Sequence, residues 1–209
     1  MKKRNVREAA LDLLLAIEKK QAYSHLQLKA YIEKHDLSPK DIGLLTELVY
    51  GTIQRKMTLD YYLSHFLKTT AKLSDWVIPL LRISLYQMVY LDRIPDRAVL
   101  YEAVEIAKKR GHPGIASFVN GVLRNVQRKG LPPMDVIFCR NVLIYFDQAT
   151  CRQVIKCLSH KLADGGYLFL GHAETLAGCM EPLHMIHKGS SFFYRKGVGH
   201  LGASRSVGG

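Results

Sequence analysis

One change of pattern divides this 209-residue sequence. Residues 1–131 repeat apolar side chains at helical spacing, and no stretch among them alternates with the period of two that a half-buried strand shows. After a stop signal at 130–133 (Gly-Leu-Pro-Pro), a short apolar run, an amphipathic stretch and a second apolar run follow. We therefore expect an all-α bundle over 1–131, a truncated α/β half-sheet over 132–197 and a disordered tail over 198–209.

Local signals mark the ends of several helices in the bundle. Ser38 and Pro39 are typical of a helix start, because serine caps the first turn and proline fits its backbone. Gly111 follows the basic run 108–110, which is typical of a helix end. Apolar side chains at helical spacing predict helices over 6–17, 42–53, 59–66, 99–106 and 118–126.

The second part is predicted to begin inside a nucleotide-type sheet. Its first apolar run, 135–139, is typical of a buried central strand, and Asp147 is placed to cap the helix that follows. The Asp-Gly-Gly at 164–166 predicts a turn into a strand at 167–170, and 183–187 with 192–195 predict a hairpin. The strand that should flank 135–139 is missing, so we expect self-association through this open edge.

Positive charge is concentrated in the bundle. The chain has a net charge of +12, and residues 1–131 hold 22 Lys and Arg against 13 Asp and Glu, a balance of +9. Such an excess favours a polyanion such as RNA, although a solvated surface without function would look the same. The predicted RNA-binding residues are Lys2, Lys3, Arg4, Arg7, Arg55 and Lys56, with Arg124, Arg128 and Lys129 as additions. Arg124 has an alternative as an ion-pair partner of Glu102 or Glu105, and Asn120 and Gly121 are assigned to close helix packing.

Three ordered motifs in the first part carry a resemblance. They are Tyr-Gly-Thr at 50–52 with Arg55 and the Leu-Asp pair at 59–60, the segment 94–108, and Phe-Val-Asn-Gly-Val-Leu-Arg at 118–124. Together they resemble the NusB-like N-terminal domain of the RsmB (Sun/Fmu) family of bacterial 16S rRNA cytosine-C5 methyltransferases. The resemblance covers 1–131 and implies a helical module that binds ribosomal RNA.

The second part is similar to the carboxyl-terminal half of the CheR family, which methylates receptor glutamates with S-adenosylmethionine. The matching motifs are 138–147, 165–174 and 193–196. The resemblance implies that Arg140 and Asn141 contact the cofactor, while His172 and Glu174 lie after the next strand. Structural roles for His172 and Glu174 are favoured over acid–base catalysis.

The departure from that family governs the function we expect. The glycine-rich loop and the acidic residue that hold the cofactor after the first two strands have no counterpart, so cofactor binding is expected to be weak or absent and no catalytic residue is assigned. The expected function is RNA binding by a NusB-like module fused to an incomplete methyltransferase domain. The alternatives are a methyltransferase, acting on rRNA or on protein glutamates, that a partner chain or a dimer completes, and a recombined or artificial fusion.

The remaining signals point away from metals and membranes. The four cysteines (139, 151, 157 and 179) lack zinc-site spacing and are expected to be reduced thiols, with Cys139 in a core. His184 and His187 would face opposite sides of a strand, so no metal site is predicted. No apolar run approaches the roughly 20 residues of a membrane span, and a cytoplasmic protein is expected.

Overall fold

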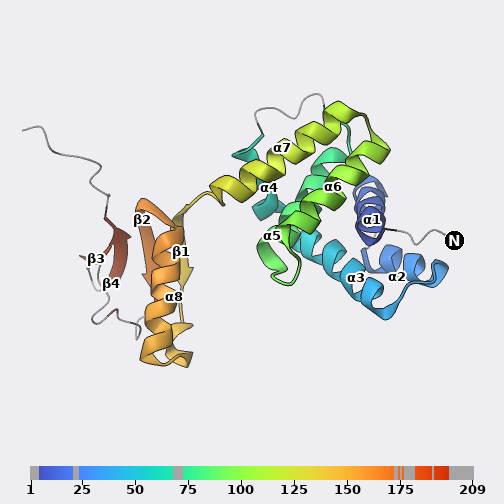
Figure 1. Ribbon diagram of the computed structural model, residues 1–209. Coiled ribbons are helices and arrows are strands. Elements are labelled where there is room, and N and C mark those ends of the chain that lie inside the picture. The colour runs from blue at the N-terminus through green and yellow to red at the C-terminus, as the bar shows by residue number, and fades with distance from the viewer. Residues whose placement is uncertain are drawn as a thin grey trace, which may run out of the picture. The chain divides into compact units, whose positions relative to one another are not determined.

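The computed structural model describes residues 5–20, 24–67, 73–171, 174, 176, 182–189 and 191–197. The chain divides into two compact units, Met1–Leu131 and Pro132–Gly209. In the described part, the first unit is made of helices and the second of a small sheet with one long helix (Figure 1). The basic arm at 2–4 and the tail at 198–209 lie outside the described residues. Within the described ranges, no helix combines the length and apolar character needed to cross a membrane.

The first unit confirms the predicted bundle. Its helices are α1 (Val6–Lys20), α2 (Ser24–Lys34), α3 (Pro39–Gln54), α4 (Lys56–Ser64), α5 (Val77–Tyr90), α6 (Asp96–Arg110) and α7 (Pro113–Lys129). The predicted cap of α3 is present, because the Asp41 amide donates to Ser38 Oγ at 3.2 Å. Gly111 ends α6 as predicted.

The centre of the bundle is α5, which periodicity did not reveal. Most of its side chains are buried, including Leu80, Leu81, Ile83 and Leu85. A helix that packs on all sides carries apolar residues all round, and therefore lacks the one-sided stripe by which helices are recognised in a sequence.

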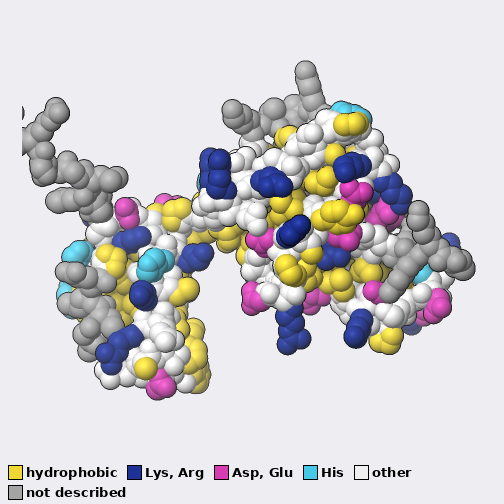
Figure 2. All heavy atoms as spheres, in the orientation of Figure 1, with side chains coloured by type: hydrophobic (Ala, Val, Ile, Leu, Met, Phe, Trp, Pro, Cys, Tyr) yellow, Lys and Arg dark blue, Asp and Glu magenta, His cyan; other side chains and the backbone are white. Residues whose placement is uncertain are grey.

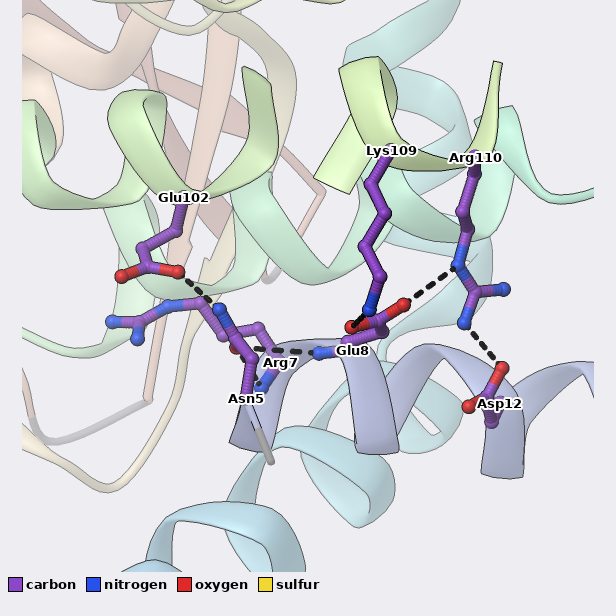
Figure 3. A network of polar contacts seen from close by, with 7 residues as sticks. All are labelled: Asn5, Arg7, Glu8, Asp12, Glu102, Lys109 and Arg110. Atoms are coloured by element: carbon purple, nitrogen blue, oxygen red, sulfur yellow. Dashed lines mark hydrogen bonds and ion pairs between the residues drawn. The ribbon is translucent and has the colours of Figure 1, made fainter. Parts of the chain in front are cut away.

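Ion pairs between distant segments join α1 to the end of α6 (Figure 3). Lys109 Nζ lies 2.7 Å from Glu8 Oε2, and Arg110 pairs with Asp12 and with Glu8. Two of the three basic residues at the end of α6 are thus neutralised by carboxylates of α1.

The second unit is a mixed four-stranded sheet in the order β1-β2-β4-β3. Its elements are β1 (Met134–Cys139), the 3-10 turn η1 (Leu143–Tyr145), α8 (Gln148–Lys161), β2 (Leu162–Leu170), β3 (Leu183–Lys188) and β4 (Ser191–Lys196). β1 and β2 are parallel, and β2, β4 and β3 are antiparallel neighbours. The predicted hairpin and the Asp147 cap are confirmed, the latter by a 2.7 Å bond from the Thr150 amide.

Two details of the sheet differ from the prediction. β1 is an edge strand, as the missing flanking strand predicts, but its side chains are not buried as expected: Val136 is 44% exposed and Phe138 72% exposed. The Asp-Gly-Gly segment does not precede β2 but lies within it, where the register between β1 and β2 shifts and Gly165 has a φ of +79°. Glycine is suited to such a bulge because it adopts positive φ without a steric cost.

Candidate RNA-binding surface and cofactor loop

Arg55 and Lys56 lie together where α3 meets α4, and both are exposed. The Arg55 guanidinium lies 4.3 Å from the centre of the Tyr90 ring, a cation–π contact that holds it near the end of α5. Lys56 Nζ lies 2.7 Å from Glu18 Oε1, and this carboxylate also pairs with Arg82 at 3.0 Å. The charge of Lys56 is therefore partly neutralised, while Arg55 faces an aromatic ring.

Arg7 differs from the other predicted RNA-binding residues. Its side chain is half-buried, and its Nε donates to the buried Gln87 Oε1 at 2.7 Å. Burial lowers the pKa of Arg7, and the nearby Glu102 carboxylate opposes this shift. Arg7 thus helps to fasten α1 to α5. Lys2, Lys3 and Arg4, the rest of the predicted arm, lie outside the described residues.

Gly121, Arg124 and Arg128 form an exposed stripe on α7, and it has fewer contacts with other helices than the sequence suggested. Arg124 does not pair with Glu102 or Glu105; its Nε donates to Asn120 Oδ1 at 3.1 Å, and Arg128 bonds Asn125 Oδ1 at 3.2 Å. Gly121 packs against nothing, because a Cβ there would meet no atom within 4 Å. Neither arginine forms an ion pair with a carboxylate of the described residues. Figure 2 shows Lys and Arg side chains along α7.

This stripe was recognisable only in part. Gly121, Arg124 and Arg128 follow one another at helical spacing on a single face. The sequence gives that spacing, but it does not reveal whether a neighbouring helix covers the face. The packing assigned to Gly121 was wrong for this reason.

In the second unit, the loop after β1 is built around one buried carboxylate. Glu174 is 4% exposed, and Asn141 in this loop has a φ of +58°. The carboxylate accepts backbone N–H bonds from Gly171 (2.6 Å), Leu143 (2.7 Å), Val142 (2.8 Å), Asn141 (2.9 Å) and Ile144 (3.4 Å). Such a ring of amides stabilises an anion.

These contacts give Glu174 a structural role. Burial raises the pKa of Glu174, but the backbone amides of Gly171, Asn141, Leu143 and Val142 outweigh it and hold the pKa below its ordinary value. Gly171 is confined by the same arrangement, because a Cβ there would lie 2.6 Å from Glu174 Oε2 and 2.8 Å from Asn141 Oδ1. A carboxylate held ionised in this way is a poor proton donor. His172 lies outside the described residues.

Arg140 and Asn141 stand where a ligand of an α/β sheet is expected, at the carboxyl end of β1. Arg140 is exposed and lines a cavity of about 220 Å³ with Phe138 and Phe169. The remaining groups do not fit S-adenosylmethionine. In the described part of the chain no strand precedes β1, and the carboxylate at this end, Glu174, binds backbone amides and not ribose hydroxyls.

The other polar candidates form no site. Among the described residues, no group of three or more His, Cys, Asp or Glu side chains is arranged to hold a metal ion. Cys139 is buried, as expected for a core residue. Burial raises the pKa of its thiol, and the negative charge of Glu174 raises it further. Cys151 and Cys157 are also free thiols, and Cys179 lies outside the described residues.

Comparisons with known proteins separate the same two regions. Residues 4–128 match the model of the NusB family, and residues 115–191 match that of the CheR methyltransferase, SAM binding domain. The second match begins inside α7, upstream of the first strand. It covers the sheet strands β1 and β2 and the loop with Arg140 and Asn141.

Curated relatives match about two thirds of this chain or less. A protein of Bacillus subtilis (strain 168) described as probable ribosomal RNA small subunit methyltransferase B is 60% identical over 137 residues, which are 66% of this chain and 31% of that protein. This chain thus spans about a third of that relative's length. Transcription antitermination protein NusB of Bacillus velezensis is 36% identical over 129 residues, 61% of this chain and 96% of that protein.

Solved structures show the same bundle fold. NusB in a complex with NusE and double-stranded RNA is 20% identical, with a TM-score of 0.54 over 59% of this chain and 94% of that one. A NusB of T. maritima is 24% identical with a TM-score of 0.54, over 61% of this chain and 91% of that one. With the family match over 4–128, the first unit identifies this chain as a member of the NusB family.

Proposed function

We propose that this chain is an RNA-binding module of the NusB type, that its RNA is ribosomal, and that its methyltransferase unit is incomplete and does not transfer methyl groups alone. The observation that carries the proposal is the unneutralised pair Arg124 and Arg128 on an exposed face of a bundle with a charge balance of +9. Guanidinium groups without carboxylate partners are free to bind phosphates and release counterions. The 60% identity to a ribosomal RNA methyltransferase supports the choice of RNA.

The ion pairs of the bundle show which of the predicted RNA-binding residues are already neutralised by carboxylates. Arg124, Arg128 and Arg55 are exposed and form no ion pair with a described carboxylate, whereas Lys56 shares Glu18 with Arg82. We assign phosphate contacts to these three arginines first and to Lys56 second. Lys2, Lys3 and Arg4 are retained in the proposal on their charge, and Arg7 is assigned a supporting role through Gln87.

The test measures the binding of a labelled rRNA hairpin to the full chain by fluorescence anisotropy at several salt concentrations. Replacing Arg124 and Arg128 together by Ala should weaken binding and lower the slope of log affinity against log salt by about two. The matched control replaces Lys19 and Lys29, which are exposed but already paired with Asp75 and Glu33. Equal effects of the two double variants would refute this assignment, because RNA binding would then depend only on the total positive charge.

The incomplete methyltransferase unit has its own test. Methyl transfer requires the cofactor and the nucleophile to be held in line, and the groups that would cradle the cofactor are missing from the described residues. Calorimetric titration of the full chain with S-adenosylmethionine should therefore give no saturable heat in the micromolar range. A micromolar isotherm that Asn141→Ala abolishes would instead favour a functional methyltransferase.

A methyltransferase completed by a second chain remains the alternative, and the edge of β1 favours it. β1 pairs only with β2 among the described strands, and two of its side chains, Val136 and Phe138, are exposed. Figure 2 shows hydrophobic side chains over this edge and the loop after it. A short apolar edge without lysine or proline is prone to pair with another strand. We therefore propose self-association through β1.

A further inference from the structure

The two faces of the sheet differ in chemistry. The face that packs with Ile155 of α8 is mainly aliphatic and includes Ile137, Leu168, Leu170 and Met185. Because side chains alternate along a strand, Phe138, Tyr167, Phe169 and Phe193 belong to the opposite face, and none of them joins that core. These aromatic side chains lie outside the hydrophobic core of the unit, and a patch of apolar side chains outside the core is typical of a binding surface.

The aromatic side chains form a continuous row across three strands. The ring centres of Phe138 on β1 and Phe169 on β2 are 4.9 Å apart, with their planes within 19° of parallel. Phe169 is 5.4 Å from Phe193 on β4, and Tyr167 lies 5.8 Å from Phe193. Phe138 ends the row at the free edge of the sheet and is 72% exposed, so a further planar ring can extend the stack there.

Positive groups border this row. The Arg195 guanidinium lies 5.6 Å from the centre of the Tyr167 ring, and its Nε donates to the Gly165 carbonyl at 3.2 Å. Arg140 lines the cavity of about 220 Å³ that also contains Phe138, Phe169 and Phe193. Strand alternation adds Lys188 of β3 to the same face. The described strand residues of this face include no Asp or Glu.

We propose that this aromatic face is a binding platform for single-stranded RNA. It is separate from the surface of the bundle, with Arg55, Arg124 and Arg128, that we propose for structured RNA. Unpaired bases stack on aromatic side chains of open sheets, while arginine and lysine at the border hold the phosphates. The absence of carboxylates from the described part of this face suits a polyanion. A face meant for a covering helix of an α/β fold would be rich in Val, Ile and Leu, as the face toward α8 is.

Phe138 is the residue to test, because its high exposure keeps the effect of its removal on folding small. The probe is a labelled, unstructured RNA of about eight nucleotides, titrated with the full chain. Phe138→Ala should weaken binding roughly ten-fold, because one stacked base is lost. Phe138→Trp, which keeps a stacking surface, should bind as well as the parent.

The matched control is Tyr145→Ala, which removes a side chain that is 79% exposed and lies outside the strands. It should change the affinity for the single strand by less than two-fold. Arg195→Gln should weaken binding and lower its salt dependence by about one charge. Circular dichroism of each variant confirms that the fold is intact.

Two results would overturn the proposed binding platform. One is an affinity for the single strand that Phe138→Ala leaves unchanged; if this variant also loses self-association in light scattering, a protein segment covers the face instead. The other is an equal loss of affinity in Tyr145→Ala, which would indicate nonspecific binding to exposed aromatic side chains. The hairpin experiment with Arg124 and Arg128 uses a different RNA and different variants. A negative result in one of the two experiments therefore does not decide the other.

Discussion

At the residue scale, the most informative side chain is Glu174. A structural role was expected of it ahead of acid–base catalysis, and its carboxylate closes the loop after β1 by accepting backbone amides. A buried carboxylate with several such bonds stabilises the structure only while it is ionised. The loop that presents Arg140 and Asn141 therefore depends on the charge of Glu174.

The first prediction is a pH dependence of this loop. The folded-state pKa of Glu174 lies below its ordinary value of about 4.3. Its contribution should thus be complete above that value and be lost as the pH falls through the lower folded pKa. Glu174→Gln should cost about 2 kcal/mol of local stability at neutral pH and remove the acid transition.

The measurement is hydrogen exchange of the Val142 and Leu143 amides, compared between the parent and the variant after correction for intrinsic rates. Glu105→Gln is the control, because the ion pair of Glu105 with Lys108 is exposed. Unchanged protection of the two amides in Glu174→Gln would contradict the structural role.

At the element scale, two glycines of α3 make opposite predictions. A Cβ on Gly51 would lie 2.1 Å from Tyr86 Cζ of α5, whereas a Cβ on Gly43 would meet nothing within 4 Å. Burial and the hydrogen bond to Glu47 raise the pKa of Tyr86 to about 12, and the donation of its hydroxyl to the Glu47 carboxylate holds the ring in place. Gly51 is thus required for the close approach of α3 and α5.

Gly51→Ala should destabilise the bundle by about 1–3 kcal/mol, because the added methyl group overpacks this contact. Gly43→Ala should stabilise it by up to about 1 kcal/mol, since alanine favours an exposed helix interior. Urea denaturation followed by circular dichroism at the helix band measures both. Equal effects of the two substitutions would show that Tyr86 does not confine α3.

A third prediction concerns the free edge of β1. Val136→Lys places a charge on this strand and should reduce self-association in light scattering, because lysine guards an edge against pairing. Val142→Lys is the control: Val142 is 40% exposed and lies just after the strand. A parent that stays monomeric at high micromolar concentration would contradict association through this edge.

Prediction from the sequence worked where the pattern is local and failed where it depends on neighbours. The caps at Ser38 and Asp147 and the hairpin were predictable because each signal lies within a few residues. The helix α5 was not, because burial on all sides removes its periodicity. The open edge of β1 was predicted from the missing flanking strand, but the exposure of Val136 and Phe138 was not, because an apolar run is typical of a buried strand.

The candidate sites follow the same division. The sequence identified Arg140 and Asn141 at the end of β1, and it identified Arg55 and Lys56 as basic residues. It could not reveal that Arg7 packs on Gln87 or that Lys56 shares a carboxylate with Arg82, because those contacts join segments that are far apart in the chain. The aromatic row was likewise invisible, since it depends on the register between β1, β2 and β4.

At the scale of the whole molecule, the two units differ in completeness. The first unit covers nearly the full length of the NusB proteins it resembles, 96% in one case. The second matches part of the CheR methyltransferase, SAM binding domain, and no strand precedes β1 in the described part of the chain. We therefore expect the RNA affinity of the chain to come mainly from the bundle.

The most direct test of this account is the affinity of the full chain for a structured fragment of small-subunit rRNA, measured across a series of salt concentrations. The account predicts tight binding at low salt and a linear fall of log affinity against log salt, with a slope that corresponds to several phosphate contacts. Replacing Lys2, Lys3 and Arg4 together by Ala should reduce the slope by up to about three. Absence of binding at low salt, or an affinity that salt does not change, would contradict the assignment of this chain as an RNA-binding module.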